Sequence, residues 1–253
     1  MQNTYVINAF FPSMLRKIEL MESLIIQLEI LNPKESFRYY IDSVYNAVPI
    51  VQRDTWLKKQ LDANNMITIS NGNEQLLSSI TFSQMAMANA KTSFNFSTLH
   101  LSLNESMWSE IDWYALIHNI GIQFDSYELD IFPPRNTNFI NRQVLHQDQL
   151  RKIPYDLPGI PDGKYGILVN ELPKQFSWIS YWSKELVENA QINLAIAKQM
   201  FYRTEELTNG ALIIQMTETP LNLEIPEHLS LLKNAYHEFP RVGGRHLLPE
   251  HLR

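Results

Sequence analysis

The sequence predicts an α+β fold, in which an antiparallel or mixed β-sheet has helices packed against it in a single domain. Segments rich in β-branched and aromatic residues recur along the chain, and they do not alternate strictly with helical segments as they would in a parallel α/β fold. At 253 residues the chain is long enough to bury a sizeable core, and it contains no cysteine to form disulfides. The core must therefore come from the packing of these elements alone.

The N-terminus is expected to form a strand followed by a long helix. Residues 1–11 contain a short apolar run that is typical of a first strand. Ser13 can cap the next helix by accepting a hydrogen bond from a free backbone N–H. The apolar residues of that helix recur every three or four positions, at Met14, Ile18, Met21, Ile25 and Leu28, until Asn32-Pro33 ends the pattern.

The later elements follow from the same rules. Strands are expected at 36–44, 94–103, 124–132, 166–171 and 210–217, and helices at 54–61, 106–119, the second half of 186–203, and 226–239. Residues 64–79 read as a polar stretch with a turn at Asn71-Gly72-Asn73. The helix at 106–119 is expected to turn four residues inward: Trp108, Ile111, Ala115 and Ile117.

A proline-rich segment at about 133–163 is the best candidate for a long connection. Strands and helices continue in the same style on both sides of it. A domain boundary and a loop inside one domain are therefore equally compatible with the pattern, and a single α+β domain spanning residues 1–253 is the prediction retained.

The charge of the chain is unevenly distributed. The sequence has 27 acidic and 21 basic residues, but residues 92–134 hold six acids and 204–232 hold five, and neither stretch contains Lys or Arg. Such stretches favour association with a basic partner and disfavour contacts with nucleic acid, which need Lys and Arg. Two solvated surfaces without a partner are an equally plausible interpretation.

Few enzyme classes fit the sequence. Thiolate metal sites and cysteine nucleophiles are excluded, and no phosphate-binding glycine motif is present among the eight glycines. His246 and His251 lack a useful metal-ligand spacing, and Ser102 beside His100 lacks a third catalytic group. No cofactor or metal is therefore expected.

Two hydrolase interpretations remain as alternatives. Asp125, Glu128 and Asp130 offer carboxylates of the kind that act as acid and base in glycosidases. Asp162 and Lys164, with Asp148 or Asp156 upstream, are similar to the metal site of restriction-type nucleases. A solvated acidic face and a turn before a strand are the simpler interpretations of the two patterns.

The densest aromatic cluster lies at Trp178-Ile-Ser-Tyr-Trp182. Such residues form hydrophobic cores, and they also anchor protein interfaces. Core burial is the simpler interpretation, and an interface is the next. The residues expected to contact a partner are the acids and aromatics of these segments: Glu105, Glu110, Asp112, Asp125, Glu128, Asp130, Trp178, Tyr181, Trp182, Glu205 and Glu206.

The C-terminal half, roughly residues 160–245, resembles the immunity protein 52 family of bacterial polymorphic toxin systems. The matching residues are Gly166, Gly210, Thr217, Pro220, Pro226, His228, Gly243 and Gly244, most of which look structural; Ile167 stands where the family often has an aromatic residue. The resemblance implies an α+β protein that binds and neutralises a toxin encoded beside it, often a nuclease.

The resulting hypothesis is a non-catalytic immunity protein whose partner is a cognate toxin, expected to be a basic nuclease domain. The N-terminus lacks the basic region and apolar length of a signal peptide, and no stretch approaches the ~20 apolar residues of a membrane helix. A cytoplasmic protein without nucleic-acid or membrane partners is expected. The oligomeric state stays open.

Overall fold

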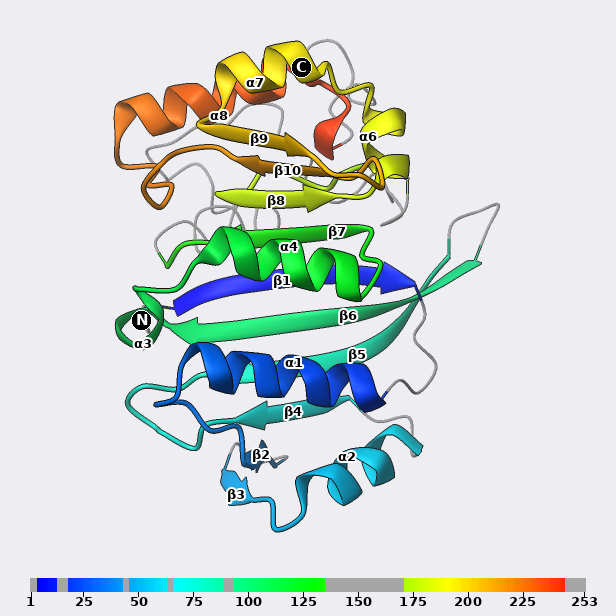
Figure 1. The fold of residues 1–253 in the computed structure, drawn as a ribbon, viewed down its shortest axis with the longest axis vertical. Coiled ribbons are helices and arrows are strands. Elements are labelled where there is room, and N and C mark those ends of the chain that lie inside the picture. The colour runs from blue at the N-terminus through cyan, green and yellow to red at the C-terminus, as the bar shows by residue number, and fades with distance from the viewer. Residues whose placement is uncertain are drawn as a thin grey trace, which may run out of the picture. The chain divides into compact units, whose positions relative to one another are not determined.

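The computed structural model describes residues 4–12, 18–42, 46–62, 66–88, 93–134 and 171–243. The chain divides into two compact units, unit 1 at Met1–Ser126 and unit 2 at Tyr127–Arg253. Figure 1 shows the helices and strands of each. All strand pairings described within the two units are antiparallel. The predicted α+β class is confirmed, and the single-domain organisation stays a prediction.

Unit 1 is built on six strands in the order β3-β2-β4-β5-β6-β1. They are β1 (Thr4–Pro12), β2 (Tyr39–Ile41), β3 (Ala47–Pro49), β4 (Ile67–Ser70), β5 (Ser79–Ala88) and β6 (Ser93–Asn104). The first strand pairs with β6 along its whole length, from Thr4 opposite Asn104 to Pro12 opposite Phe96. The N-terminal strand is therefore held by a segment far away in the sequence.

Helices α1 (Ile18–Leu31) and α4 (Trp113–Gln123) lie in front of the strands in the view of Figure 1 and run roughly along them. The predicted stripe on α1 is confirmed, because Met21, Ile25 and Leu28 are all buried. Burial of each such side chain is worth about 1.5–3 kcal/mol. The two helices also meet through Gln123, whose Oε1 accepts from Gln27 Nε2 at 3.0 Å.

Several predictions for unit 1 are wrong in their details. Strands β3, β4 and β5 were not predicted, and β4 occupies part of the expected polar stretch at 64–79. The expected helix at 106–119 is two helices, α3 (Glu105–Trp108) and α4, because the Asp112 side chain caps α4 by accepting from Ala115 N at 2.9 Å. Trp108 and Ile117 are buried as expected, whereas Ile111 is only half-buried and Ala115 is exposed.

A buried carboxylate, Glu35, connects three parts of unit 1. Its Oε1 accepts from Ser78 Oγ at 2.6 Å and from Trp108 Nε1 at 3.0 Å, and its Oε2 accepts from Asn71 Nδ2 at 2.8 Å. Asn71 and Ser78 flank the β4–β5 turn, where Gly72 has a φ of 71°. This is the predicted turn, and Glu35 ties it to α3.

Unit 2 contains a four-stranded sheet in the order β7-β8-β10-β9. The strands are β7 (Glu128–Phe132), β8 (Ile179–Trp182), β9 (Arg203–Glu206) and β10 (Leu212–Gln215), and the helices are α6 (Lys184–Ala190), α7 (Leu194–Met200) and α8 (Pro226–Glu238). The helix at 226–239 and the strand at 210–217 are confirmed within a few residues. Strand β9 was not predicted, and only the second half of 124–132 is a strand.

The core of unit 2 is aromatic. The ring of Phe176 lies 5.1–6.1 Å, centroid to centroid, from four other rings: Trp182, Phe201, Tyr236 and Phe239. Trp178, Tyr181 and Trp182 are at most 5% exposed. The aromatic cluster of the sequence is therefore core.

Some predictions lie outside the described residues. These are the Ser13 cap with Met14, nearly all of the proline-rich connection at 133–163, the strand at 166–171 except Glu171, and Asp148, Asp156, Asp162, Lys164, His246 and His251.

Candidate functional site

Glu128 and Asp130 lie in the core of unit 2, so their expected place on an acidic surface is wrong. They are 0% and 1% exposed. Glu128 Oε1 accepts from the backbone N–H of Lys174 at 2.7 Å, and Asp130 Oδ1 accepts from Ser180 Oγ at 3.0 Å. A charge in such a position needs these partners to offset its desolvation.

Burial changes the acidity of these groups. It raises the pKa of Asp130 to about 7, although the Ser177 and Ser180 hydroxyls and the charge of Lys174 act to lower it. Burial, followed by the charge of Asp130, raises the pKa of Glu128 well above its usual range. Burial also lowers the pKa of the Lys174 ammonium, against the attraction of both carboxylates. The three groups form one coupled cluster.

Some polar atoms in and around this cluster have no hydrogen-bond partner. Among the described residues, Glu128 Oε2, Asp130 Oδ2 and Trp182 Nε1 are buried without a hydrogen-bond partner. Protonation of a carboxylate lowers the cost of such burial, which agrees with the raised pKa values. The hydroxyl of Tyr236, whose pKa burial also raises, accepts from Phe176 N at 3.0 Å nearby.

The predicted contact acids of unit 1 lie around the α3–α4 corner and at the end of α4. Glu105 begins α3, Asp112 caps α4 and Asp125 follows α4 with a φ of 49°. Acids at helix N-termini are stabilised by the helix dipole and by free N–H groups. Glu105 and Asp112 therefore have local structural roles, whereas Glu110 is exposed and stands outside both helices.

We call Tyr202, Glu205, Glu206 and Glu218, which lie on β9 or beside its partner strand β10, the β9 surface. The Tyr202 side chain is 56% exposed, and its hydroxyl donates to Glu218 Oε1 at 3.3 Å. Glu205 accepts from Arg203 at 3.0 Å and is 41% exposed. Glu206 at the other end of β9 is exposed as well.

Local structure positions Tyr202 firmly. Its backbone N–H donates to Met216 O at 3.2 Å, which extends the β9–β10 pairing by one residue. Thr204 Oγ1 donates to Ala197 O at 3.2 Å and joins β9 to α7 (Figure 1). The sequence analysis missed Tyr202 because it placed this residue inside a helix. The only signal in the sequence was the pair of adjacent aromatic residues, Phe201-Tyr202. In the structure the Phe201 ring is buried and the Tyr202 ring is exposed.

The proposed catalytic arrangements find no support in the described residues. His100 is exposed, and its Nδ1 lies 2.8 Å from Asn8 Oδ1 on the paired strand β1. Asp125 is exposed, whereas Glu128 and Asp130 are buried, so the three carboxylates share no accessible face. Within the described ranges, no three or more His, Asp or Glu residues are grouped as they would be around a metal ion.

Most residues of the immunity-family resemblance have local structural roles where they are described. Gly210 has a φ of 81°, Thr217 O accepts from Trp178 Nε1 at 3.0 Å, and His228 Nδ1 accepts from Asn222 N at 3.0 Å. Pro226 occupies the first turn of α8, and Gly243 has a φ of 69°. Gly166, Ile167 and Gly244 lie outside the described residues.

None of the helices in the described ranges combines the length and the apolar character that crossing a bilayer requires.

Comparisons with known proteins identify a family and similar solved structures. A family model described as "Domain of unknown function (DUF5953)" matches residues 19–247. The chain is similar in fold to a solved structure described as "Pseudomonas aeruginosa T6SS protein PA0821", with a TM-score of 0.55 and 12% sequence identity, over 93% of this chain and 73% of that one. No curated protein matches the chain.

Proposed function

The chain belongs to the DUF5953 family, and on that premise we propose that it is an immunity-type protein that binds and neutralises a cognate bacterial toxin, without catalysis of its own. The observation that carries this proposal is the exposed Tyr202 side chain, whose hydroxyl donates to the exposed carboxylate of Glu218 beside the acidic strand β9. The resemblance to the immunity protein 52 family belongs to the same proposal.

The chemistry of the β9 surface suits a basic protein partner. Tyrosine is enriched among the residues that dominate interface energies, since it buries a large rigid ring and offers a hydroxyl. Carboxylates beside it attract Lys and Arg and raise the association rate. A toxin with a nucleic-acid-binding cleft presents these cations, so the β9 surface would occlude the cleft by mimicking the charge of its substrate.

The fold relative supports the setting of this proposal. That protein is described as a T6SS protein, which is consistent with a secretion-related role for this chain. A protective, toxin-binding role agrees with the exposed acids of the described residues, which remain available for a partner.

Co-expression with the toxin encoded beside the gene tests the proposal. The chain should restore growth of a toxin-producing cell and co-purify with the toxin. Tyr202→Ala should weaken the complex by about 30-fold or more, as expected for an interface anchor worth 2 kcal/mol. The matched control is Glu238→Lys, which reverses an exposed charge on α8, outside the β9 surface, and should leave binding unchanged.

Two results would overturn the proposal. One is a chain that neither restores growth nor co-purifies with the toxin. The other is a Tyr202→Ala variant that is folded and binds as tightly as the original chain, which would remove the β9 surface from the account.

A further inference from the structure

A groove in unit 1 has the size of a small-molecule site. Its volume is about 340 Å³, and it lies among β2, α2 and β4. Small-molecule sites commonly have volumes of about 300–1,000 Å³. The lining residues are Tyr40, Ile41, Trp56, Lys59, Gln60, Met66 and Thr68.

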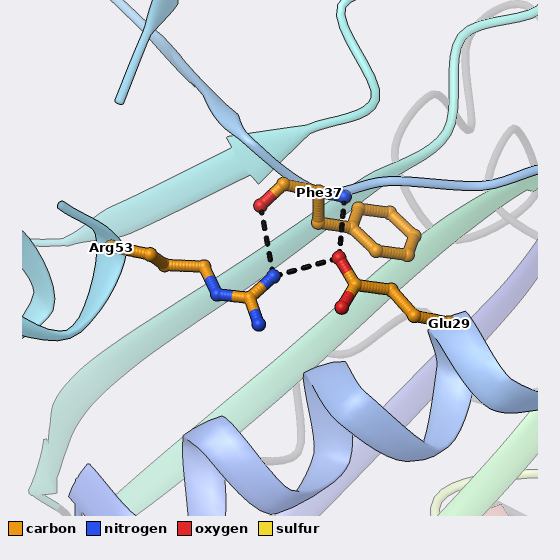
Figure 2. A network of polar contacts seen from close by, with 3 residues as sticks. All are labelled: Glu29, Phe37 and Arg53. Carbon is orange, nitrogen blue, oxygen red and sulfur yellow. Dashed lines mark hydrogen bonds and ion pairs between the residues drawn. The ribbon is translucent and has the colours of Figure 1, made fainter. Parts of the chain in front are cut away.

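The start of α2 (Arg53–Asp62) is fixed by the network in Figure 2. Glu29 Oε1 on α1 accepts from Arg53 Nη1 at 2.7 Å and from Phe37 N at 3.0 Å, while the same Nη1 lies 3.4 Å from Phe37 O. The Arg53 and Glu29 side chains are only 19% and 22% exposed, so solvent screens this ion pair less than a surface pair. The network holds α2 beside the chain that leads into β2.

This anchoring places an aromatic platform in the groove. Trp56 lies one turn after Arg53, and its ring stacks on Tyr40 with a centroid distance of 5.3 Å and an interplanar angle of 23°. The other four tryptophans of the chain are buried, whereas Trp56 is partly exposed. Met66 in the lining is 71% exposed. These apolar surfaces stay open to water, which core packing alone does not require.

The positive charge of Lys59 in the lining favours a negatively charged ligand. Lys59 is the one ionised residue among the lining residues that the structure describes, and none of these carries a carboxylate. An ammonium attracts carboxylate or phosphate as a point charge, while the aromatic rings favour a flat or apolar body. Gln60 and Thr68 add polar atoms, although the Thr68 hydroxyl already shares a hydrogen bond with Thr81 at 3.0 Å.

We propose that this groove binds a small anion with a flat ring, a class that includes nucleoside monophosphates and aromatic carboxylates. The site is separate from the proposed toxin-binding function, because none of its lining residues belongs to the β9 surface. Either proposal can fail while the other holds.

The test measures binding of adenosine monophosphate to the full chain. Adenosine and inorganic phosphate, the two halves of that ligand, are measured separately, and indole-3-acetate serves as the aromatic carboxylate. Titration calorimetry should show saturable binding of at least one of the two ring-bearing anions, at least tenfold tighter than that of either half. Binding of adenosine monophosphate, which does not emit in the tryptophan range, should quench the accessible part of the tryptophan emission. Trp56→Phe should remove this quenching.

Lysine variants identify the site. Lys59→Gln should weaken binding by about tenfold through loss of the charged contact. Lys58→Gln is the matched control, since this neighbouring lysine is exposed and does not line the groove, and it should bind normally. The proposal is overturned if neither ring-bearing anion binds saturably, or if both folded lysine variants bind as the original chain does.

Discussion

The alternation of residues along a strand shows which side chains share a face, but it does not show whether that face is buried in the core or exposed to solvent. Glu128 and Asp130 share a face of β7, as their spacing in the sequence predicted. That face is buried because Ser180 and the backbone N–H of Lys174 supply hydrogen bonds from segments some fifty residues away. These hydrogen-bond partners are brought to β7 only by the tertiary structure. The buried pair was therefore predicted to be part of an acidic surface.

The buried pair should make stability depend on pH. Unfolded Asp130 loses its proton near the ordinary pKa of 3.8, whereas folded Asp130 holds it up to about pH 7. The folded state then binds more protons within that window, so the free energy of unfolding should fall as the pH rises from about 4 to 7. Glu128 acts in the same direction. The limit is about 1.4 kcal/mol per pH unit for each proton.

Urea unfolding at several pH values checks this expectation. Lys174 acts with the opposite sign, because the unfolded state binds more protons between the lowered folded pKa of Lys174 and its ordinary value of 10.5, so stability falls as the pH falls across that range. The variant Asp130→Asn lacks the titrating carboxyl group, so its free energy of unfolding should depend less steeply on pH between 4 and 7 than that of the original chain. An exposed control, Glu206→Gln, should leave the slope unchanged. Equal slopes in all three proteins would contradict the assignment.

Glu35 should contribute to stability through its charge-assisted hydrogen bonds. In Glu35→Gln an amide replaces one carboxylate oxygen, so an N–H₂ group must face the donors from Ser78, Trp108 or Asn71. The expected loss is about 2–3 kcal/mol in the free energy of unfolding, as for a buried donor left unpaired. Chemical denaturation measures it, and the exposed substitution Glu188→Gln on α6 serves as control. A loss below about 0.5 kcal/mol would refute this role.

At the scale of elements, the capping residue decides where α3 ends and α4 begins. Asp112→Ala should lower the free energy of unfolding by about 1 kcal/mol, because Ala115 N loses its side-chain acceptor. Glu110→Ala, which changes an exposed acid two residues earlier, should stay within about 0.5 kcal/mol. Thermal or urea unfolding of the two variants compares them directly. Equal losses would mean that Asp112 does not act as a cap.

The elements predicted well are those with a strong local signal. The stripe of α1 and the Pro226 start of α8 follow from helical spacing and from the tolerance of proline in a first turn. Strand β9 reads Arg-Thr-Glu-Glu, which has little strand propensity, and it exists because β10 pairs with it. The candidate site depends on that pairing, so Glu205 and Glu206 were among the predicted contact residues, whereas Tyr202 and Glu218 were not.

At the scale of the whole molecule, the fold accounts for much of the charge segregation. Glu128 and Asp130 are core residues, Glu105 and Asp112 begin helices, and Glu205 pairs with Arg203. Two base-free stretches therefore do not make two binding surfaces. Of the predicted contact acids, Glu110, Asp125 and Glu206 remain exposed without such a role, and a partner contact is best sought at these residues first.

The affinity of the purified chain for its neighbouring toxin tests the central claim most directly. Titration at two salt concentrations should give a tight complex for the original chain. Glu206→Lys should slow association and reduce the salt dependence of binding, because a favourable charge is reversed. A toxin that shows no measurable affinity for the original chain, or a complex that Glu206→Lys and Tyr202→Ala together leave unchanged, would contradict the account.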